Sequence, residues 1–454
     1  MSKLGTDRPL RVAIVGSGPS AFYAAEALLK LDIKVKVDMF EKLPVPFGLV
    51  RYGVAPDHLK IKNVVKVFEK IAENPNFSFL GNVTVGKNIM VFELQKFYDA
   101  MIFCIGAEAD RRLGIDGEDL VGSHTATEFV AWYNGHPDYQ DHHFDFSHPV
   151  AVVIGQGNVA MDVSRILSKT PDELKTTDIS QHALEILAES KIKEVHMYGR
   201  RDPAQASFTP SEIKEMGELA DCTPVIDPED LKLTETSLKE LEDPARPVRK
   251  KNYEVLQHLA TMKEARNRKF FLHFRRSPVA IIGKGRVQKI RFEINSLVGE
   301  PGSQKVRGTG KFEEIECGII FRSIGYRGIP IKGLPFSDQT GVIPNQAGRV
   351  TDSEQIFAGC YTAGWIKRGA TGIIGTNKAD SGETVKSLLE DIDNLTPCEC
   401  PDTQEVLAFL KSREVRVVSF ADWKKIDAVE IAQGAKIGKP REKFTRVTGM
   451  LSEI

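Results

Sequence analysis

Two glycine-rich turns in this chain have the residue types that hold a dinucleotide. The first reads GSGPSA over residues 16–21, and the second reads GQGNVA over residues 155–160. Gly16 permits a tight turn, and Gly18 leaves room for a pyrophosphate to approach backbone N–H groups at a helix N-terminus, where the dipole favours negative charge. Either motif alone could also be a strand–helix turn without a ligand.

The residue that ends the following strand distinguishes the two turns. After the first turn, the run VKVDMFEK ends in Glu41, whose carboxylate would bind a ribose diol and repel a 2′-phosphate. After the second, the run IKEVHMYGRRDP ends in Arg200 and Arg201, whose guanidinium groups suit a 2′-phosphate. A solvated arginine pair is the alternative. The combination predicts FAD at the first turn and NADP(H) at the second.

The elements around the turns predict an α/β fold with two Rossmann-like dinucleotide-binding domains. Each turn follows an apolar, β-branched run typical of a strand buried on both faces, and precedes apolar residues at helical spacing. Strand-like and glycine-rich sequence returns in the C-terminal third and is expected to complete the first sheet. The NADP domain would then be inserted into the FAD domain. We expect the FAD-binding domain over residues 1–107 and 329–454, and the NADP-binding domain over residues 108–328.

Composition narrows the functional classes. The chain has 454 residues, too many for one core, and a net charge of −1 that disfavours nucleic-acid binding by an overall field. No apolar run approaches membrane-spanning length, and the residues before the first strand lack the apolar region of a secretory signal. We expect a cytoplasmic protein, or one of an organelle matrix if an import peptide has been removed, and a monomer is the simplest expectation.

Cysteine and histidine usage gives no pattern for a redox dithiol or a metal site. The six cysteines include no C-x-x-C pair, which disfavours a disulfide reductase, a zinc site and an iron–sulfur cluster. We expect free thiols and no metal. The loop over residues 135–149 is rich in histidine, matches no strong ligand spacing and is expected to be a solvated connection; its histidines are His136, His142, His143 and His148.

Several long strings in the same order carry a family resemblance. VGSGPSAFYAAEALLK, LPVPFGLVRYGVAPDH, GQGNVAMDVSRIL, GRRDPAQASFT and GWIKRGATGIIGTNK resemble adrenodoxin reductase and the related bacterial NADPH–ferredoxin reductases. The resemblance runs from about residue 9 to the C-terminus. It implies FAD and NADP(H) on two Rossmann-like domains, hydride transfer from NADPH to FAD, and transfer of single electrons to a ferredoxin-type iron–sulfur protein.

The resemblance also implies site residues, position by position. Those expected to line the FAD beside Gly16 and Gly18 are Ser20, Ala21, Glu41, Leu49 and Val85. Those expected along the NADP pyrophosphate are Gln156, Gly157, Asn158 and Val159, with Arg200, Arg201 and Glu212 on the adenosine side. Those expected beside the isoalloxazine are Trp365, Gly372, Ile373 and Ile374, with Gly372 also adjoining the nicotinamide. His58 and Asp162 match polar groups close to the flavin.

The roles of these residues follow from their chemistry. Gly372 would let the backbone approach the ring, and the N–H groups of a helix from there to about Ile392 would stabilise negative charge on reduced flavin. An ordinary glycine-rich loop is the alternative, as a core position is for Trp365. His58 is not expected to be a general acid, because hydride transfer needs no protein proton donor. Asp202 replaces a usual glycine and is expected to point to solvent.

A basic stretch is a candidate docking face for an acidic ferredoxin. It comprises Arg246, Arg249, Lys250 and Lys251, with Arg275 and Arg276 further on, inside a polar segment (227–253) that resembles a surface excursion. A solvated helix face is the equal alternative from the residues alone, and the resemblance favours the ferredoxin.

The leading functional hypothesis is therefore an FAD-dependent NADPH–ferredoxin oxidoreductase. Three alternatives stay open: an NADPH diaphorase or quinone reductase, an electron-input flavoprotein subunit of a larger complex, and a flavin-binding interaction module without enzymatic activity. Missing cysteine clusters count against the subunit of a larger complex.

Overall fold

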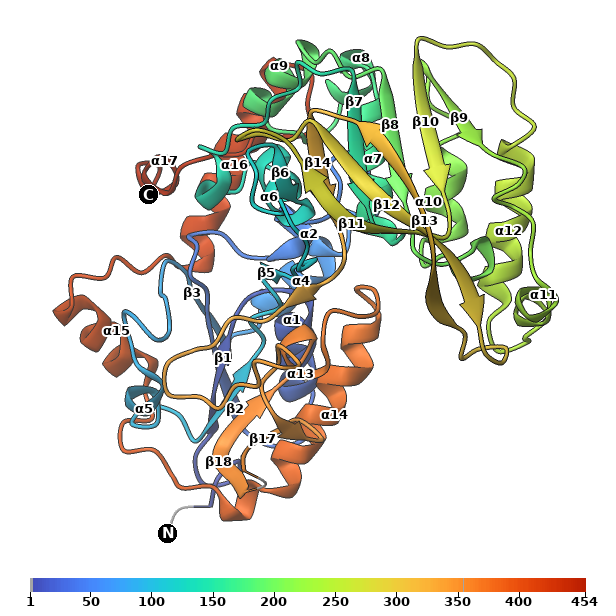
Figure 1. Cartoon of the computed structure of the whole chain (residues 1–454). Coiled ribbons are helices and arrows are strands. Elements are labelled where there is room, and N and C mark those ends of the chain that lie inside the picture. Colours follow the sequence, from blue (N-terminus) through green and yellow to red (C-terminus); the bar gives the residue numbers. More distant parts are fainter. Residues whose placement is uncertain (1–2, 354) are drawn as a thin grey trace.

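A seven-stranded sheet combines strands from both ends of the chain (Figure 1). The computed structural model describes residues 3–353 and 355–454. The strand order is β16-β17-β18-β4-β1-β2-β3, and the central strands pair in parallel. The strands are β1 (Leu10–Val15), β2 (Val35–Phe40), β3 (Phe77–Leu80), β4 (Ala100–Phe103), β16 (Asn345–Gln346), β17 (Arg349–Asp352) and β18 (Gln355–Thr362).

A second, six-stranded parallel sheet is built from the middle of the chain. Its order is β6-β14-β7-β8-β10-β9. The strands are β6 (Ser123–Thr125), β7 (Val150–Ile154), β8 (Glu194–Tyr198), β9 (Cys222–Ile226), β10 (Arg268–His273) and β14 (Ile319–Arg322). β1 and β7 each lie inside their sheet and are almost wholly buried, as their apolar sequences predict.

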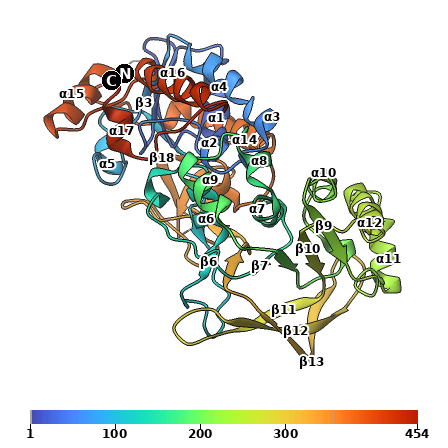
Figure 2. The same cartoon turned by 90° about the horizontal axis from the view of Figure 1, so that it is seen from above.

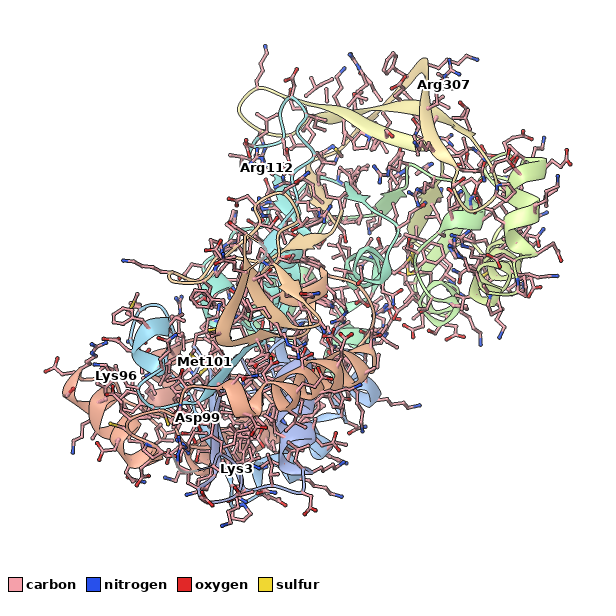
Figure 3. The ribbon with its side chains drawn as sticks, turned by 90° about the horizontal axis from the view of Figure 1, so that it is seen from below. Lys3, Lys96, Asp99, Met101, Arg112 and Arg307 are labelled. Atoms are coloured by element: carbon pink, nitrogen blue, oxygen red, sulfur yellow. The ribbon has the colours of Figure 1, made fainter. Side chains whose placement is uncertain are left out.

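A three-stranded antiparallel sheet covers part of one face of the second sheet (Figure 2). It consists of β11 (Arg276–Ile282), β12 (Lys289–Val298) and β13 (Lys305–Glu316), and β13 is largely exposed on both faces around Arg307 (Figure 3). Ile290 and Phe292 of this sheet pack with Val152 and Ile154 of β7. The opposite face of the six-stranded sheet packs against helices, including α7 (Asn158–Ser168) and α12 (Pro247–Leu259).

Helices cover the remaining faces of both sheets. Up to the middle of the chain they are α1 (Pro19–Leu29), α2 (Leu49–Tyr52), α3 (Leu59–Lys62), α4 (Val65–Ala72), α5 (Val91–Leu94), α6 (Ala126–Tyr133), α7 (Asn158–Ser168), α8 (Pro171–Leu174) and α9 (Gln181–Ala188). The later ones are α10 (Pro210–Glu215), α11 (Glu235–Leu241), α12 (Pro247–Leu259), α13 (Trp365–Arg368), α14 (Thr376–Glu390), α15 (Thr403–Ser412), α16 (Phe420–Lys436) and α17 (Val447–Leu451). Short 3₁₀ turns are η1 (Pro137–Tyr139), η2 (Pro203–Gln205) and η3 (Ile392–Asn394).

The packing of α1 explains how the first turn is held. Pro19 occupies the first helical position, where its missing N–H costs nothing. Ala21 and Ala25 are fully buried and let α1 lie close to β1 and α14. The N-terminus of α1 therefore lies beside the carboxyl end of β1, and the glycine-rich turn connects the two.

The chain crosses between the two large sheets along a short ribbon. β5 (Ala109–Asp110) pairs antiparallel with β15 (Tyr326–Arg327), so that the outgoing and returning segments lie side by side. The expected domain boundaries fall within a few residues of this ribbon, and as exact boundaries they stay a prediction.

One expectation about a loop holds only in part, and another is wrong. Residues 227–253 are largely exposed, as a surface excursion should be, but they form α11 and begin α12, with Leu231 and Leu241 buried. The histidine-rich loop is not wholly solvated, because Phe144 and Phe146 pack on Phe129 in the same core. In both cases apolar residues within or just beyond a polar stretch anchor it.

The helix expected from Gly372 to about Ile392 forms as α14, which begins four residues later at Thr376 and ends at Glu390. Among the described residues, no helix combines the length and apolar character needed to cross a membrane.

Candidate functional site

The first glycine-rich turn combines one glycine that the fold requires with one that it does not. Gly16 has φ +102°, and a Cβ there would lie 2.5 Å from the carbonyl oxygen of Cys104. Gly18 caps α1 with φ −77°, and a Cβ there would meet no described protein atom within 4 Å. The space in front of Gly18 is therefore open, as a site for a pyrophosphate at a helix N-terminus must be.

Glu41 lies directly after β2 and is fixed by two hydrogen bonds. Its carboxylate accepts from the Ser17 hydroxyl at 2.6 Å and from the Leu43 backbone N–H at 3.0 Å. Burial raises the pKa of Glu41 above its ordinary value, and these hydrogen bonds oppose the rise. The carboxylate is thereby held beside the first turn as an acceptor.

The other residues expected at the FAD lie around this turn in different environments. Ser20 is buried, and a Cβ on Gly364 would lie 2.5 Å from its hydroxyl oxygen. Val85 is buried, whereas Leu49, at the start of α2, is 46% exposed. An exposed leucine beside a glycine-rich turn suits an apolar ligand surface.

The segment from Trp365 to Ile374 connects the first sheet to α14. Trp365 is half-buried: its indole N–H donates to the Thr371 carbonyl at 3.1 Å, and its ring stacks on Tyr326 at 5.7 Å. Gly372 has φ +81°, and a Cβ there would lie 2.8 Å from the Thr376 side chain. Glycine is thus required by the turn itself, and Ile373 beside it is 68% exposed.

The second glycine-rich turn repeats the arrangement of the first. Gly155 has φ +135°, and a Cβ there would lie 2.1 Å from the Ser323 carbonyl oxygen. Gly157 caps α7, and a Cβ there would meet no described atom within 4 Å. Side chains pin the turn, since Gln156 donates to the His273 carbonyl at 3.0 Å and Asn158 accepts from the Thr209 N–H at 2.9 Å. Val159 packs against the core behind it.

Arg200 and Arg201 follow β8 and are both exposed. Within the described residues neither guanidinium group forms an ion pair. Both backbones are fixed: the Arg200 carbonyl accepts from the Asn295 side chain at 3.0 Å, and the Arg201 carbonyl accepts from the Arg275 N–H at 2.8 Å. An arginine pair with a fixed backbone and uncommitted guanidinium groups is suited to an external anion.

The expectation that Asp202 points to solvent is wrong. Its side chain is buried, caps η2 by accepting from the Ala204 N–H at 3.0 Å, and accepts from the Ser237 hydroxyl. Burial raises the pKa of Asp202, and the Ser237 hydrogen bond lowers it. The residue anchors α11 instead of weakening the field of the arginine pair.

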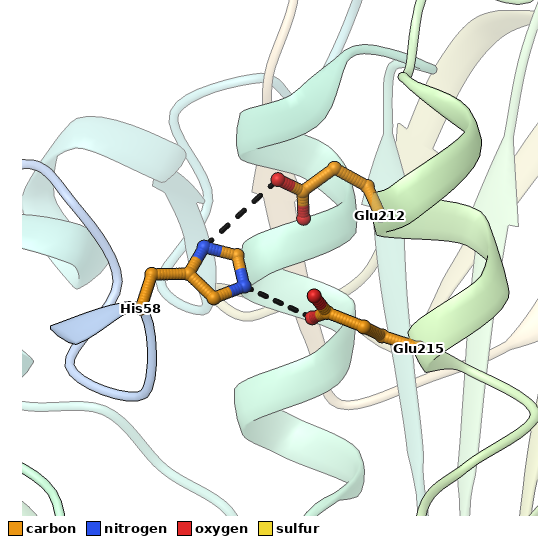
Figure 4. Close-up of side chains that lie close together, drawn as sticks. All are labelled: His58, Glu212 and Glu215. Carbon is orange, nitrogen blue, oxygen red and sulfur yellow. Dashed lines mark hydrogen bonds and ion pairs between the residues drawn. The ribbon is translucent and has the colours of Figure 1, made fainter. Parts of the chain in front are cut away.

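His58 and Asp162 meet in a charged cluster. Figure 4 shows Glu212 and Glu215 of this cluster on either side of the His58 imidazole. His58 Nε2 lies 2.9 Å from Glu215, and its Nδ1 lies 3.8 Å from Asp162 and 3.9 Å from Glu212. Arg165 donates to Asp162 at 2.6 Å and to Glu212 at 2.9 Å.

Three further residues belong to this cluster and were not predicted from the sequence: Arg165, Glu215 and Asp57. The one available signal was the spacing of Glu212 and Glu215, which puts both on one face of a helix. No signal in the sequence links Asp57 or Arg165 to these glutamates, because the contacts join segments far apart in the chain.

Burial and mutual repulsion set the protonation of this cluster. Burial and the neighbouring Asp162 raise the pKa of Glu212 to about 7. Burial opposes the charge on His58, but the Glu215 hydrogen bond and the Asp162 and Asp57 charges raise the pKa of the imidazole. His58, Glu212 and Glu215 offer ligand atoms within 4.8 Å of one another. Arg165, however, donates to Glu212 and forms an ion pair with Glu215 at 3.4 Å, which makes the arrangement an ion-pair network.

The expected basic face does not form one free surface. Arg276 pairs with Asp230 and Glu313, Arg249 pairs with Glu240, and Arg275 donates to two backbone carbonyls of the 229–232 turn. Acidic residues of the same region therefore neutralise Arg249 and Arg276. Arg246, Lys250 and Lys251 stay exposed on or beside α12.

All six cysteines are free, as expected, and five of them are buried. Burial raises the pKa of Cys104, beside the first turn, to about 12, so that this thiol is protonated at neutral pH.

Comparisons with known proteins agree with this geometry. A family model described as an NAD(P)-binding Rossmann-like domain matches residues 14–80. NADPH-ferredoxin reductase FprA of Mycobacterium tuberculosis is 46% identical over 98% of this chain and 99% of its own. Human mitochondrial NADPH:adrenodoxin oxidoreductase is 42% identical over 97% of this chain and 91% of its own.

A solved structure of M. tuberculosis FprA in complex with NADPH matches with a TM-score of 0.91 and 45% identity, over 98% of this chain and 99% of that one. Identity at this level over nearly the whole of both chains establishes the family. The chain belongs to the family of NADPH–ferredoxin and NADPH:adrenodoxin reductases.

Proposed function

We propose that this protein is an FAD-dependent NADPH–ferredoxin oxidoreductase, which takes a hydride from NADPH and passes single electrons to a ferredoxin-type iron–sulfur protein. One observation carries the proposal: two glycine-rich turns with open Cβ positions are followed by opposite charges, Glu41 at one and Arg200 with Arg201 at the other. Family membership supports the same reaction.

The residues around the first turn fit FAD. The backbone from Gly16 to Ala21 would receive the pyrophosphate at the N-terminus of α1, and Glu41 would accept hydrogen bonds from a ribose. Leu49 and Val85 with the segment Trp365–Ile374 would supply apolar and backbone contacts to the ring system. Bound there, FAD would supply hydride acceptance and the conversion of a two-electron input into single-electron output.

The residues around the second turn fit NADP(H). The turn from Gln156 to Val159 would receive the pyrophosphate at the N-terminus of α7, and Arg200 and Arg201 would bind the 2′-phosphate. We propose Glu212 as a further contact, and the proton that its raised pKa retains near neutral pH makes it a possible hydrogen-bond donor.

The chain's own groups contribute positioning and electrostatics rather than covalent chemistry. Between Ile373 and the first turn of α14, the backbone N–H groups of Ile374 and Gly375 donate to no described residue, and they would stabilise negative charge on the ring. Trp365, fixed by Thr371 and Tyr326, would orient the ring edge. His58 and Asp162 would set the local field, and neither is needed as a proton donor in hydride transfer.

We propose the division of the chain into an FAD-binding domain over residues 1–107 and 329–454 and an NADP-binding domain over residues 108–328. Strands from both ends of the chain in one sheet support it, as does the β5–β15 ribbon between the sheets. Each domain then carries one glycine-rich turn.

For the partner, we propose an acidic ferredoxin that docks near the exposed residues Arg246, Lys250 and Lys251, on a monomeric reductase. A cytoplasmic location, or an organelle matrix after import, is proposed with it.

The test is anaerobic reduction of the purified holoprotein by NADPH, followed by addition of a ferredoxin from the same cell. We expect the flavin absorbance to bleach and the ferredoxin to be reduced at low reductase concentration. Bleaching followed by electron transfer only to quinones would assign a diaphorase, and absence of bleaching would leave a flavin-binding module.

A further inference from the structure

Arg165 joins the two large parts of the chain through one buried guanidinium group. It lies on α7, next to the second glycine-rich turn, and its side chain is wholly buried. Its Nε and Nη2 donate to the two carboxylate oxygens of Asp57 at 2.8 and 3.0 Å. Asp57 lies between α2 and α3, on the side of the seven-stranded sheet, and directly precedes His58.

The same guanidinium group holds the carboxylates that face His58. Besides its two bonds to Asp57, Arg165 donates through Nη2 to Asp162 and through Nη1 to Glu212. These two carboxylates lie within 4 Å of His58 Nδ1, and Glu215 takes the other imidazole nitrogen. One side chain therefore holds both carboxylates that face His58 Nδ1, together with the aspartate that precedes the histidine in the chain.

The charges of the cluster make this guanidinium group hard to replace. Four carboxyl groups, those of Asp57, Asp162, Glu212 and Glu215, gather around it. Among the described lysines and arginines, Lys169 is the one other partner of these carboxylates, at 2.7 Å from Asp57. A planar guanidinium group can donate to several carboxylates in fixed directions, whereas a lysine ammonium group is a point charge on a flexible stem. Removing one member of a buried ion-pair network leaves the others uncompensated.

We propose that Arg165 is a positioning residue for hydride transfer, which aligns the two nucleotide-binding parts of the chain through Asp57 and holds Asp162 and Glu212 against His58. The inference rests on the proposed function. Because the nicotinamide and the flavin would be bound by different sheets, the contact between the sheets sets the approach of the two rings. A displacement of about 1 Å at the reacting atoms can cost about a hundredfold in rate.

The experiment compares Arg165→Lys with the wild-type holoprotein. We expect unchanged FAD content, because Arg165 contacts none of the proposed FAD ligands. The NADPH dissociation constant should rise by no more than about threefold, because the second turn, Arg200 and Arg201 are unaltered and only Glu212 loses a hydrogen bond. The limiting rate of flavin reduction at saturating NADPH should fall about tenfold or more. Hydrogen exchange in residues 56–60, measured without NADPH, should become faster, because the Asp57 loop loses its bidentate anchor.

Arg322→Lys is the matched control. Arg322 is also buried and pairs with Glu118, but it lies on β14 and contacts none of the cluster residues. It should lower stability without changing the limiting rate or the exchange of residues 56–60. Asp57→Asn provides a second variant, because it weakens only the contact between Asp57 and Arg165. Its limiting rate of flavin reduction should fall less than that of Arg165→Lys. In the double variant the two losses should not add, because both changes disturb the same contact.

The proposal is overturned if Arg165→Lys and Asp57→Asn both reduce their flavin within about twofold of the wild-type rate while losing stability as Arg322→Lys does. If Arg165→Lys does not fold, the rate of flavin reduction in Asp57→Asn decides alone, and a rate within about twofold of wild type overturns the proposal. A wild-type protein that NADPH does not reduce at all would defeat the proposed function itself, whereas a reducible wild type with unaffected variants would defeat only the role of Arg165.

Discussion

At the scale of single residues, coenzyme selection depends on the sign of the charge at each nucleotide site. Glu41 is fixed beside the first turn by Ser17 and Leu43. Arg200 and Arg201 are exposed beside the second, with fixed backbones and no ion pair among the described residues. A carboxylate repels a 2′-phosphate that a guanidinium group binds, so the two sites should select different coenzymes.

Replacement of Arg200 and Arg201 by alanine should raise the KM for NADPH and leave the KM for NADH nearly unchanged. Hydrogen bonds to charged groups contribute about 1.5–3 kcal/mol each, so the expected increase is about tenfold or more. Steady-state kinetics with both coenzymes provide the measurement. Lys96→Ala is the control, since Lys96 is an exposed cation that precedes β4 of the other, seven-stranded sheet by a few residues (Figure 3). Equal effects on the two coenzymes would contradict the 2′-phosphate assignment.

Gly18→Ala tests whether the first turn holds FAD. The new Cβ would meet no described protein atom, and φ of −77° suits alanine, so the fold should tolerate the change at a cost below about 1 kcal/mol. The Cβ would, however, enter the proposed path of the pyrophosphate. We expect a folded protein that retains much less FAD after gel filtration, whereas Gly382→Ala, inside α14 and equally free of contacts, should retain it. Full retention of FAD in Gly18→Ala would remove the pyrophosphate from this turn.

At the scale of elements, the site depends on how α14 holds the segment before it. Asp380 of α14 accepts a hydrogen bond from the Gly364 N–H at 2.5 Å. It also pairs with Lys367 and Arg368 of α13, both at 3.1 Å. This one carboxylate therefore fixes both the turn before Trp365 and the short helix that Trp365 begins.

Asp380→Ala should loosen the segment 364–372 and weaken FAD binding while leaving NADPH-side contacts intact. FAD retention during dilution and the near-ultraviolet signal of Trp365 provide the measurement. Glu383→Ala is the control, because Glu383 also pairs with Lys367 but is more exposed and does not contact Gly364. If both variants bind FAD as the wild type does, α14 does not organise the flavin side of the site.

Many of the strands and helices that position the site could be predicted from the sequence. The buried strands before each turn, the helices after them and the return of the C-terminal third to the first sheet follow from periodicity and from the glycine motifs. The cluster of Asp57, Arg165 and Glu215 could not be predicted, because three distant segments meet only in the folded chain. Likewise, nothing local showed that Asp202 would find Ser237, or that Phe144 and Phe146 would anchor a polar loop.

At the scale of the whole molecule, a buried charge group joins the C-terminal segment to the middle of the chain. Asp178, between α8 and α9, pairs with Lys62 at 2.7 Å and with Lys443 at 3.3 Å. Two ammonium groups thus share one carboxylate in a buried site. Burial lowers the pKa of Lys443 to about 7, and the Asp178 charge only partly opposes this; burial also lowers the pKa of Lys62.

This arrangement predicts that the free energy of unfolding rises between pH 7 and pH 9. Unfolded lysine has a pKa of about 10.4, so in this window the unfolded chain binds a proton at Lys443 that the folded chain releases, and stability increases with pH. The expected gain from this group is about 1–2 kcal/mol. Urea unfolding at the two pH values measures it.

Lys443→Met should flatten this pH dependence, whereas Lys425→Met, at an exposed position on α16, should leave it unchanged. An identical slope in wild type and Lys443→Met would show that Lys443 is charged in the folded protein at both pH values.

The central claim is that two distinct nucleotide sites bring NADPH and FAD together on one chain, and anaerobic stopped-flow reduction tests it most directly. The holoprotein is mixed with NADPH or with NADH, and the flavin absorbance is followed. The account predicts rapid bleaching by NADPH and a much weaker response to the same concentration of NADH. A colourless protein that does not take up FAD, or a flavin that NADPH leaves oxidised, would contradict it.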